Sequence, residues 1–211
     1  MPDAAPARLD AQKKALAAAE RDEAARAAWR AEVAALDPAD LVFFDETSTH
    51  TAMTRTRARS PRGTRAAGSA PRNRGPNVTL LASLTPAGMG PAVLIPGAAT
   101  RPVFDRFVAD LLAPSLRPGQ TVVLDNLAVH KSARARALIE AAGCRPLFLP
   151  AYSPDFSPIE LLFSPIKTRL RAAAARTPDD LLAAVAEALA AVTTGHARAC
   201  YHHCGYRITD Q

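Results

Sequence analysis

The sequence predicts a single α/β domain, a mixed β-sheet flanked by helices, with a helical connector in front of it. Its 211 residues and 48% hydrophobic content suffice for one core, or for two small ones at most. Apolar runs of strand type come first as a hairpin and then alternate with helical periodicities, an order typical of sheets covered by helices on both faces. We assign residues 1–36 to the connector and residues 37–211 to the domain.

Each element follows from a local pattern. The alanine-rich residues 8–36 lack glycine and proline and predict one or two helices, which end at Asp37-Pro38. Short apolar runs predict five strands, at 41–46, 77–85, 91–97, 120–126 and 145–150, with the turn "PAGMG" joining the second to the third. Helical spacing predicts helices at 100–116, at 131–143, from Pro158 onward and at 177–192, followed by a polar tail.

The positive charge is concentrated in one segment. The formal net charge is +6, and seven arginines without any acidic residue lie between Thr54 and Arg74. They fall in residues 46–77, where glycine and proline predict a long loop or an irregular hairpin. The other 19 basic residues are balanced by 20 acidic ones. A local basic block favours a polyanion partner such as DNA, and a solvated arginine loop without a partner is the alternative.

Composition also bounds the compartment. No apolar run approaches the roughly 18 residues that a bilayer-spanning helix needs, and the charged N-terminus lacks the apolar core of a signal peptide. The three cysteines, Cys144, Cys200 and Cys204, cannot form a fully paired disulfide framework. We therefore expect a cytoplasmic protein in a reducing compartment, with no membrane partner.

Two aspartates end apolar runs in the same way. The run "LVFFDE" leads to Asp45, and "TVVLDN" leads to Asp125. Carboxylates at the carboxyl ends of buried strands lie at the rim of the sheet, where α/β proteins build their sites. If the two strands are neighbours, the two carboxylates could share a cation. Taken singly, each aspartate could instead start a turn.

A third carboxylate, Glu160, follows a stiff segment. "LPAYSPDFSP" contains Pro150, Pro154 and Pro158, which restrict its path. The tetrapeptide "SPIE" fits a capping box, with Ser157 as the cap and Glu160 at the third helical position. A fixed helix start can also aim Glu160 at the sheet rim, so capping and a role in a site both stay open.

Three carboxylates form an all-oxygen donor set of the kind that binds hard divalent cations. Such a site would hold Mg²⁺ or Mn²⁺, and its natural chemistry is phosphoryl transfer with two ions per active site. Lys167 lies two helical turns after Glu160 and could meet a phosphate, or it could be a solvent-exposed lysine. His130 and Lys131 follow Asp125 closely; His130 could contact the scissile strand or have a local structural role. The tail motif "HHC" lacks the spacing of a zinc site.

Three segments together resemble the catalytic domain of bacterial insertion-sequence transposases of the mariner-like superfamily. They are "FFDETSTHTAMTRTRARSPRGTR", "VVLDNLAVHKS" and "FLPAYSPDFSPIELLFSPIKTRLR", and the closing "ACYHHCGY" also resembles the end of that domain. The resemblance covers about residues 37–207. The 35 residues from Asp125 to Glu160 match the spacing that is usual in the family.

The resemblance implies a ribonuclease-H-like fold and a DDE transposase, in which Asp45, Asp125 and Glu160 are the catalytic and metal-binding triad. It implies cleavage at transposon terminal inverted repeats and transfer of the freed 3′-hydroxyl to target DNA, by a homodimer on double-stranded DNA in a bacterial nucleoid. The arginine loop would lie along DNA and contact phosphates, together with His130, Lys131 and Lys167. The arginines concerned are Arg55, Arg57, Arg59, Arg62 and Arg65.

The chain departs from the family pattern in three places. Ser157 stands where the family has asparagine, and Pro165 stands inside a predicted helix, where proline costs about 3 kcal/mol or forces a kink. Family members also carry upstream helix-turn-helix modules, which residues 1–36 are too short to supply. We expect the downstream half of a split transposase, working with a helix-turn-helix polypeptide. The alternatives are an inactive remnant that binds DNA without cutting, and a general ribonuclease-H-like nuclease.

Overall fold

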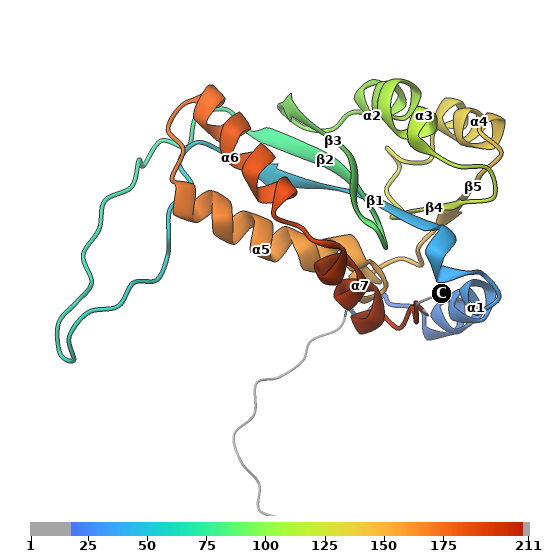
Figure 1. The fold of residues 1–211 in the computed structure, drawn as a ribbon, viewed down its shortest axis with the longest axis horizontal. Helices are drawn as coiled ribbons and strands as arrows, with labels where there is room; N and C mark the ends of the chain where they lie inside the picture. Colours follow the sequence, from blue (N-terminus) through green and yellow to red (C-terminus); the bar gives the residue numbers. More distant parts are fainter. Residues whose placement is uncertain (1–17, 209–211) are drawn as a thin grey trace, which may run out of the picture.

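The computed structural model describes residues 18–208 and is built on a five-stranded mixed sheet in the order β3-β2-β1-β4-β5 (Figure 1). Strand β2 pairs antiparallel with β1 and with β3, whereas β1, β4 and β5 run parallel. The strands are β1 (Leu41–Thr49), β2 (Val78–Thr85), β3 (Gly88–Pro96), β4 (Thr121–Leu124) and β5 (Arg145–Phe148). The predicted hairpin is therefore β2–β3, and the predicted mixed sheet is confirmed.

Helices cover both faces of the sheet, as Figure 1 shows. One face carries α5, α6 and α7, and the other carries α2, η2, α3 and α4. Helix α1 contributes Trp29 and Val33 to the same buried layer as α5, α6 and α7. The bounds are α1 (Glu23–Ala34), η1 (Pro38–Asp40), α2 (Arg101–Phe107), η2 (Val108–Leu112, a π-helical turn), α3 (Ala113–Ser115), α4 (Ala133–Ala141), η3 (Pro154–Phe156), α5 (Pro158–Ala173), α6 (Pro178–Ala190) and α7 (Thr194–His203).

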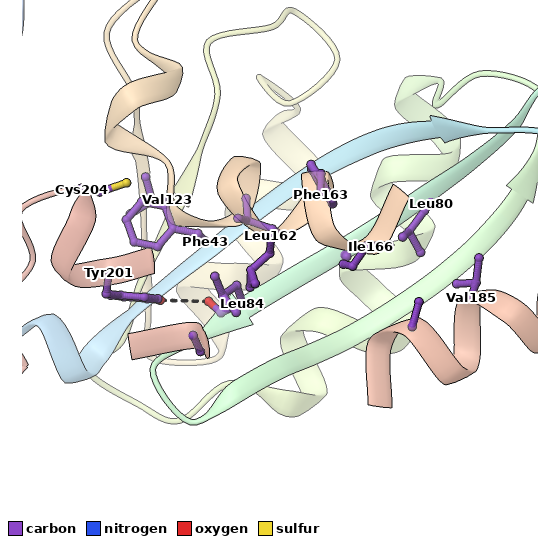
Figure 2. Close-up of a cluster of buried hydrophobic side chains, with 14 of the residues drawn as sticks. Phe43, Leu80, Leu84, Val123, Leu162, Phe163, Ile166, Val185, Tyr201 and Cys204 are labelled. Atoms are coloured by element: carbon purple, nitrogen blue, oxygen red, sulfur yellow. Dashed lines mark hydrogen bonds between the residues drawn. The ribbon is translucent and has the colours of Figure 1, made fainter. Parts of the chain in front are cut away.

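The alternation of side chains along β1 divides the core into two layers. Phe43 packs with α5, α6 and α7, whereas its neighbour Phe44 packs with α2 and α4, because successive strand residues point to opposite faces. Figure 2 shows the first layer, in which Leu162 and Ile166 of α5 lie against the strands. One buried layer on each face holds both the sheet and the helices that carry the site.

The C-terminal region corrects a prediction. Residues 194–203 form helix α7, not a polar tail, because the helix buries Ala197 and Tyr201 among its polar residues. The hydroxyl of Tyr201 lies 2.7 Å from the carbonyl oxygen of Leu41 and 3.0 Å from that of Leu84, so it ties α7 to the ends of two strands (Figure 2). These two carbonyls were not visible as partners in the local sequence.

Other element bounds also differ from the prediction. The predicted helical segment is 8–36. Of residues 18–36 only Glu23–Ala34 are helical, and residues 8–17 lie outside the described residues. Strand β1 continues past Asp45 to Thr49, since its antiparallel pairing with β2 continues to Val78. Asp45 is therefore within a strand and not at its end.

Helix α5 runs without interruption through Pro165 (Figure 1). The proline removes the amide that would bond to the carbonyl of Leu161, but both residues lie on the exposed face of the helix. The helix therefore continues past Pro165, and the predicted cost or kink stays a prediction.

Residues 50–77 form the arginine loop, a long segment without helix or strand that projects away from the body of the domain (Figure 1). Its base is held by Arg176, whose guanidinium donates to the carbonyls of Thr51 (3.0 Å) and Met53 (3.1 Å) and to the hydroxyl of Thr54 (2.8 Å). Across residues 18–208, no helix combines the length and hydropathy that crossing a bilayer requires.

Candidate carboxylate site

The two aspartates lie side by side because their strands are neighbours in register. Parallel pairing aligns Phe43 of β1 with Val123 of β4. Two residues further along both strands come Asp45 and Asp125, so the strand period of two places both carboxylates at the same level. The predicted adjacency of the two aspartate strands is confirmed, and it puts both acids where β4 ends and β1 continues, paired from there on with β2 only.

Asp45 is a buried carboxyl, 9% exposed, in a negatively charged environment. Burial is the largest cause that raises its pKa, to about 8, and the charges of Glu160, Glu46 and Asp125 raise it further. A hydrogen bond from the Glu46 amide to Asp45 Oδ1, 2.8 Å long, acts in the opposite direction. Near neutral pH this site therefore retains a proton unless a cation offsets the repulsion among its acids.

Asp125 is held by two groups from the turn that follows β4. Its Oδ1 accepts a hydrogen bond from the Leu127 amide (3.0 Å) and contacts Nδ1 of His130. The other imidazole nitrogen, Nε2, lies 3.0 Å from Oε2 of Glu46, an ion-pair distance without good hydrogen-bond alignment. His130 thus bridges the two acid-bearing strands from inside the protein.

The surroundings of His130 favour its charged form. The side chain is fully buried, and its ring contacts Phe44 and Phe104 with centroids 5.3 and 4.8 Å away. Burial, the largest single influence, lowers the pKa of His130, but the bonds and charges of Asp125 and Glu46 together outweigh it and raise the pKa to about 9. An imidazolium between two carboxylates compensates their charge at the base of the site.

Glu160 enters from the first turn of α5. Ser157 stands at the cap position and Pro158 and Glu160 follow as predicted, but the Ser157 side chain makes no capping hydrogen bond. The predicted capping box is therefore wrong. Glu160 is exposed, and its carboxylate accepts no hydrogen bond from any residue in the described part of the chain. The carboxylate is free to serve the site.

All three predicted acids line one cavity of about 370 Å³, which we call the carboxylate cavity. Its walls come from the end of β4 and from the segment 149–157, which we call the cavity segment. Within residues 18–208, no three histidine, cysteine or acidic side chains are arranged to hold a metal ion as they stand. The structure brings the three carboxylates to one cavity but does not close them around a point.

The predicted DNA-binding residues fall into three groups. The loop arginines are all exposed, and none of them lines the carboxylate cavity; they are Arg55, Arg57, Arg59, Arg62 and Arg65. Lys131 is exposed beside the end of β4, and Lys167 is partly exposed on α5, outside the cavity. His130 is buried against two carboxylates and is not placed to reach DNA, so its role is local.

Two features of the site were missed from sequence. Glu46 is the second partner of His130, and the alternation along β1 could have indicated it, since Glu46 follows Asp45 and points to the opposite face. Tyr152 lines the cavity, is 57% exposed and has a positive φ of 56°, which is unusual for a residue with a side chain. No local signal predicted that backbone conformation.

The geometry places three carboxylates in one cavity on a mixed sheet. Comparisons with known proteins then identify the family. Residues 40–182 match the family model described as DDE superfamily endonuclease. The match spans more than half of the chain, so this protein belongs to the DDE superfamily endonucleases. A search of the curated proteins by sequence gives no match.

Solved structures of the Mos1 transposase share the fold. The pre-cleavage transpososome matches with a TM-score of 0.71 and 18% identity, covering 94% of this chain and 64% of that one. The paired-end complex with the left transposon end gives 0.73 and 17%, covering 96% and 65%. The Mos1 catalytic domain with Raltegravir and Mg gives 0.63 and 15%, covering 86% of each chain.

Two conclusions follow from these matches. The ribonuclease-H-like fold predicted from the resemblance is confirmed, and so is the predicted membership of the DDE group. The chain spans less than two thirds of the length of the first two Mos1 chains and most of the length of the isolated catalytic domain.

Proposed function

We propose that this chain is a transposase catalytic domain that cleaves DNA strands at transposon ends and transfers them to target DNA. The observation that carries the proposal is the carboxylate cavity, in which Asp45, Asp125 and Glu160 come together from two neighbouring strands and a helix start. Family membership and the fold of Mos1 transposase support it. The division into a connector of residues 1–36 and a catalytic domain of residues 37–211 is part of the same proposal.

The donor set fits divalent cations. It consists of three carboxylates, and no lysine or arginine lines the cavity within the described residues. Burial and then the neighbouring acids raise the pKa of Asp45, and a bound cation would favour its ionised form. Mos1 structures have been obtained with Mg and with Mn. We assign the binding of two Mg²⁺ or Mn²⁺ ions to these carboxylates. When bound, they would activate a water or a 3′-hydroxyl and stabilise the leaving oxygen.

The chain's own residues supply the rest of the site. His130 holds Asp125 in one orientation through Nδ1 and is itself held by Glu46. Asp45 keeps a proton on its carboxyl group until positive charge enters the cavity, because burial and the neighbouring acids disfavour its ionised form. The protein is therefore prepared to exchange one proton for a cation on loading.

DNA contact is assigned to cations on the surface of the domain and on the arginine loop. The arginine loop, Lys131 and Lys167 are accessible to a phosphate backbone, and such contacts position DNA without reading its sequence. Mos1 structures contain transposon ends and a strand-transfer complex. By analogy we assign double-stranded DNA, both transposon terminal inverted repeats and target DNA, as the partner. A homodimer on DNA, a separate helix-turn-helix polypeptide and a nucleoid-associated cytoplasmic location belong to the same proposal.

One assay tests the proposal. Purified protein is incubated with pre-nicked transposon-end DNA and Mn²⁺, beside an Asp125→Asn variant. Cleavage or joining that disappears in the variant supports the transposase. Equal background in both, with DNA binding retained, would identify a remnant that binds without cutting.

Substrate choice separates the transposase from a general nuclease. The same protein is offered random duplex DNA and an RNA–DNA hybrid in parallel with transposon ends. Cleavage of all three at similar rates would favour a nuclease of the same fold acting on any nucleic acid. Salt dependence is not diagnostic, since every one of these binders would weaken steeply as salt rises.

A further inference from the structure

Helix α1 contacts the segment that leads into the Glu160 helix through a two-point ion pair. Arg26 is only 5% exposed, and its Nη1 and Nη2 donate to Oδ1 and Oδ2 of Asp155 at 3.0 and 2.6 Å. The guanidinium holds the pKa of the Asp155 carboxyl below its usual range. A fork of this kind fixes relative orientation as well as distance, so α1 and η3 are locked together.

The next residue, Phe156, is packed by the same helix. The Trp29 ring stacks on it with centroids 5.2 Å apart and planes 15° from parallel. The guanidinium carbons of Arg26 and Arg30 lie 3.9 and 4.0 Å from its ring centre. The Tyr206 hydroxyl donates to the Phe156 carbonyl at 2.6 Å. Side chain and backbone of this one residue are therefore both fixed.

The other residues of this segment face the carboxylate cavity. Residues 152–154, Ser157 and Glu160 line the cavity, whereas Asp155 and Phe156 do not. The start of α5 also lacks a side-chain cap, since the Ser157 hydroxyl makes no capping bond. The packing of Asp155 and Phe156 on α1 therefore contributes to the position of the helix start, and Phe156 lies only four residues before Glu160.

We propose that Arg26 and Trp29 are positioning residues for Glu160. By holding Asp155 and Phe156, they fix the first turn of α5, and with it the location of the Glu160 carboxylate relative to the two aspartates. The inference rests on the proposed function for the role of Glu160. It gives the predicted connector a part in the active site, although none of residues 18–36, its described part, lines the cavity.

The variants Arg26→Ala, Asp155→Ala and their double combination test the pair. The matched control is Arg145→Ala, which breaks another ion pair of α1, between Arg145 Nη2 and Glu32 Oε1 at 3.1 Å, on the side of β5 and away from the cavity. Arg26→Lys and Trp29→Phe serve as milder variants that keep the cation or the stacked ring, should the alanine forms fail to fold.

Two readouts are needed, and neither requires DNA cleavage. The first is Mn²⁺ binding to the DNA-free protein, measured by electron paramagnetic resonance. The second is amide hydrogen exchange across residues 154–165 of the metal-free protein. We expect each alanine variant of the pair to weaken Mn²⁺ binding about tenfold, as outer partners of metal ligands do, and to speed exchange at the start of α5. The double variant should be no worse than the worse single one, and Arg145→Ala should change neither readout.

Three results would overturn the inference. In the first, Arg26→Ala lowers the melting temperature but leaves Mn²⁺ binding and exchange at the start of α5 unchanged, which makes the pair merely structural. In the second, Arg145→Ala weakens Mn²⁺ binding and speeds exchange at the start of α5 as much as Arg26→Ala does, so that the effect comes from general docking of α1. In the third, the wild type binds no Mn²⁺ and exchange at α5 is the same in every variant. Variant-dependent Mn²⁺ binding without any cleavage of transposon ends would refute the proposed function and leave this inference standing.

Discussion

The cavity segment, residues 149–157, and the arginine loop, residues 50–77, are both irregular and both contain proline, yet they are built in opposite ways. In the first, Ser153, Phe156 and Ser157 are buried and the chain is fixed by contacts with α1 and the C-terminal region. In the second, every residue from 55 to 77 is exposed, and the arm is held only near its two ends, by Arg176 at Thr51–Thr54 and by the hydrogen bonds between Asn77 and Gly97.

The difference follows from what each segment has to do. A carboxylate that acts on a phosphodiester must stay within a fraction of an ångström of its working position, so its support is packed from several sides. A phosphate contact needs a positive charge within reach, and a long arginine side chain can reach a phosphate without a fixed backbone. Experiments can therefore weaken the packing of the cavity segment and the charge of the arginine loop separately.

The largest effect is expected from Glu160→Gln, which removes one charge from the carboxylate cavity. Cleavage of pre-nicked transposon-end DNA should fall by more than the roughly 10- to 100-fold that outer partners of a metal site cost. Because Glu160 is exposed and is not used as a cap, the free energy of unfolding should change by less than about 0.5 kcal/mol. Single-turnover cleavage and urea denaturation check the two parts.

The control for Glu160→Gln is Glu140→Gln, on the exposed side of α4, which pairs with Arg136 at 3.6 Å and lies outside the cavity. It should leave cleavage unchanged. Retained cleavage in Glu160→Gln would show that the helix start, however well fixed, does not carry a catalytic group.

The next largest effect is expected from replacing five loop arginines, at 55, 57, 59, 62 and 65, with alanine. DNA affinity should fall, and the slope of log affinity against log salt should lose about 0.9 for each phosphate contact removed. Cleavage at saturating DNA should persist, because the carboxylate cavity is untouched. Filter binding across a salt series, with single-turnover kinetics, measures both.

Replacing the same five arginines with lysine keeps the charge and tests whether charge is sufficient. The salt slope should then stay close to that of the wild type, since phosphate contacts that only position DNA do not require a guanidinium fork. An alanine variant with unchanged affinity would mean that the arm has no part in DNA binding.

A smaller effect, on stability, is expected from His130→Gln. The folded protein holds the His130 proton more tightly than the usual pKa of 6.5 implies, since its pKa is about 9. The stabilisation is therefore complete below about pH 6.5 and is lost as pH rises through 9. We expect wild type to exceed the variant by about 2 kcal/mol at pH 6, in line with hydrogen bonds to charged groups.

Urea denaturation in EDTA at pH 6 and at pH 9 checks this prediction. A gap between wild type and His130→Gln that widens as pH rises would show that burial, the largest influence on this imidazole, prevails over Asp125 and Glu46. In that case the base of the site would be neutral.

Much of this site could be predicted because local patterns repeat in the sequence. Asp45 and Asp125 each follow a buried apolar run. Because their strands are parallel neighbours in register, the two carboxylates lie side by side. What local patterns could not supply is contact between distant segments. Strand β1 continues past Asp45 because β2 pairs with it, and α7 forms because Tyr201 finds two backbone carbonyls.

The capping box shows the same limit at one position. "SPIE" satisfies the local pattern, yet the Ser157 side chain caps nothing, because Phe156 is fixed by Trp29, Arg26 and Tyr206 from other parts of the chain. Tertiary packing takes the place of the side-chain cap, and the Glu160 carboxylate is not used in a capping box. A motif can therefore predict where a helix begins while giving the wrong reason for it.

The smallest effect is expected from Pro165→Ala, and it addresses whether an irregularity in α5 matters to the site. The helix passes through Pro165 unbroken, and both Pro165 and Leu161 are exposed residues. Alanine would restore one backbone hydrogen bond, so unfolding should become costlier by about 1 to 2 kcal/mol, less than the roughly 3 kcal/mol of a fully formed helix interior. Glu160 precedes this hydrogen bond in the helix, and η3 and α1 contact the residues just before it. Cleavage should therefore change by less than about twofold, while the free energy of unfolding rises. Thermal melts and single-turnover cleavage on the same preparations decide the matter. A large gain in cleavage would mean that Pro165 displaces Glu160, and that the first turn of α5 is governed from within the helix and not by its packing on α1.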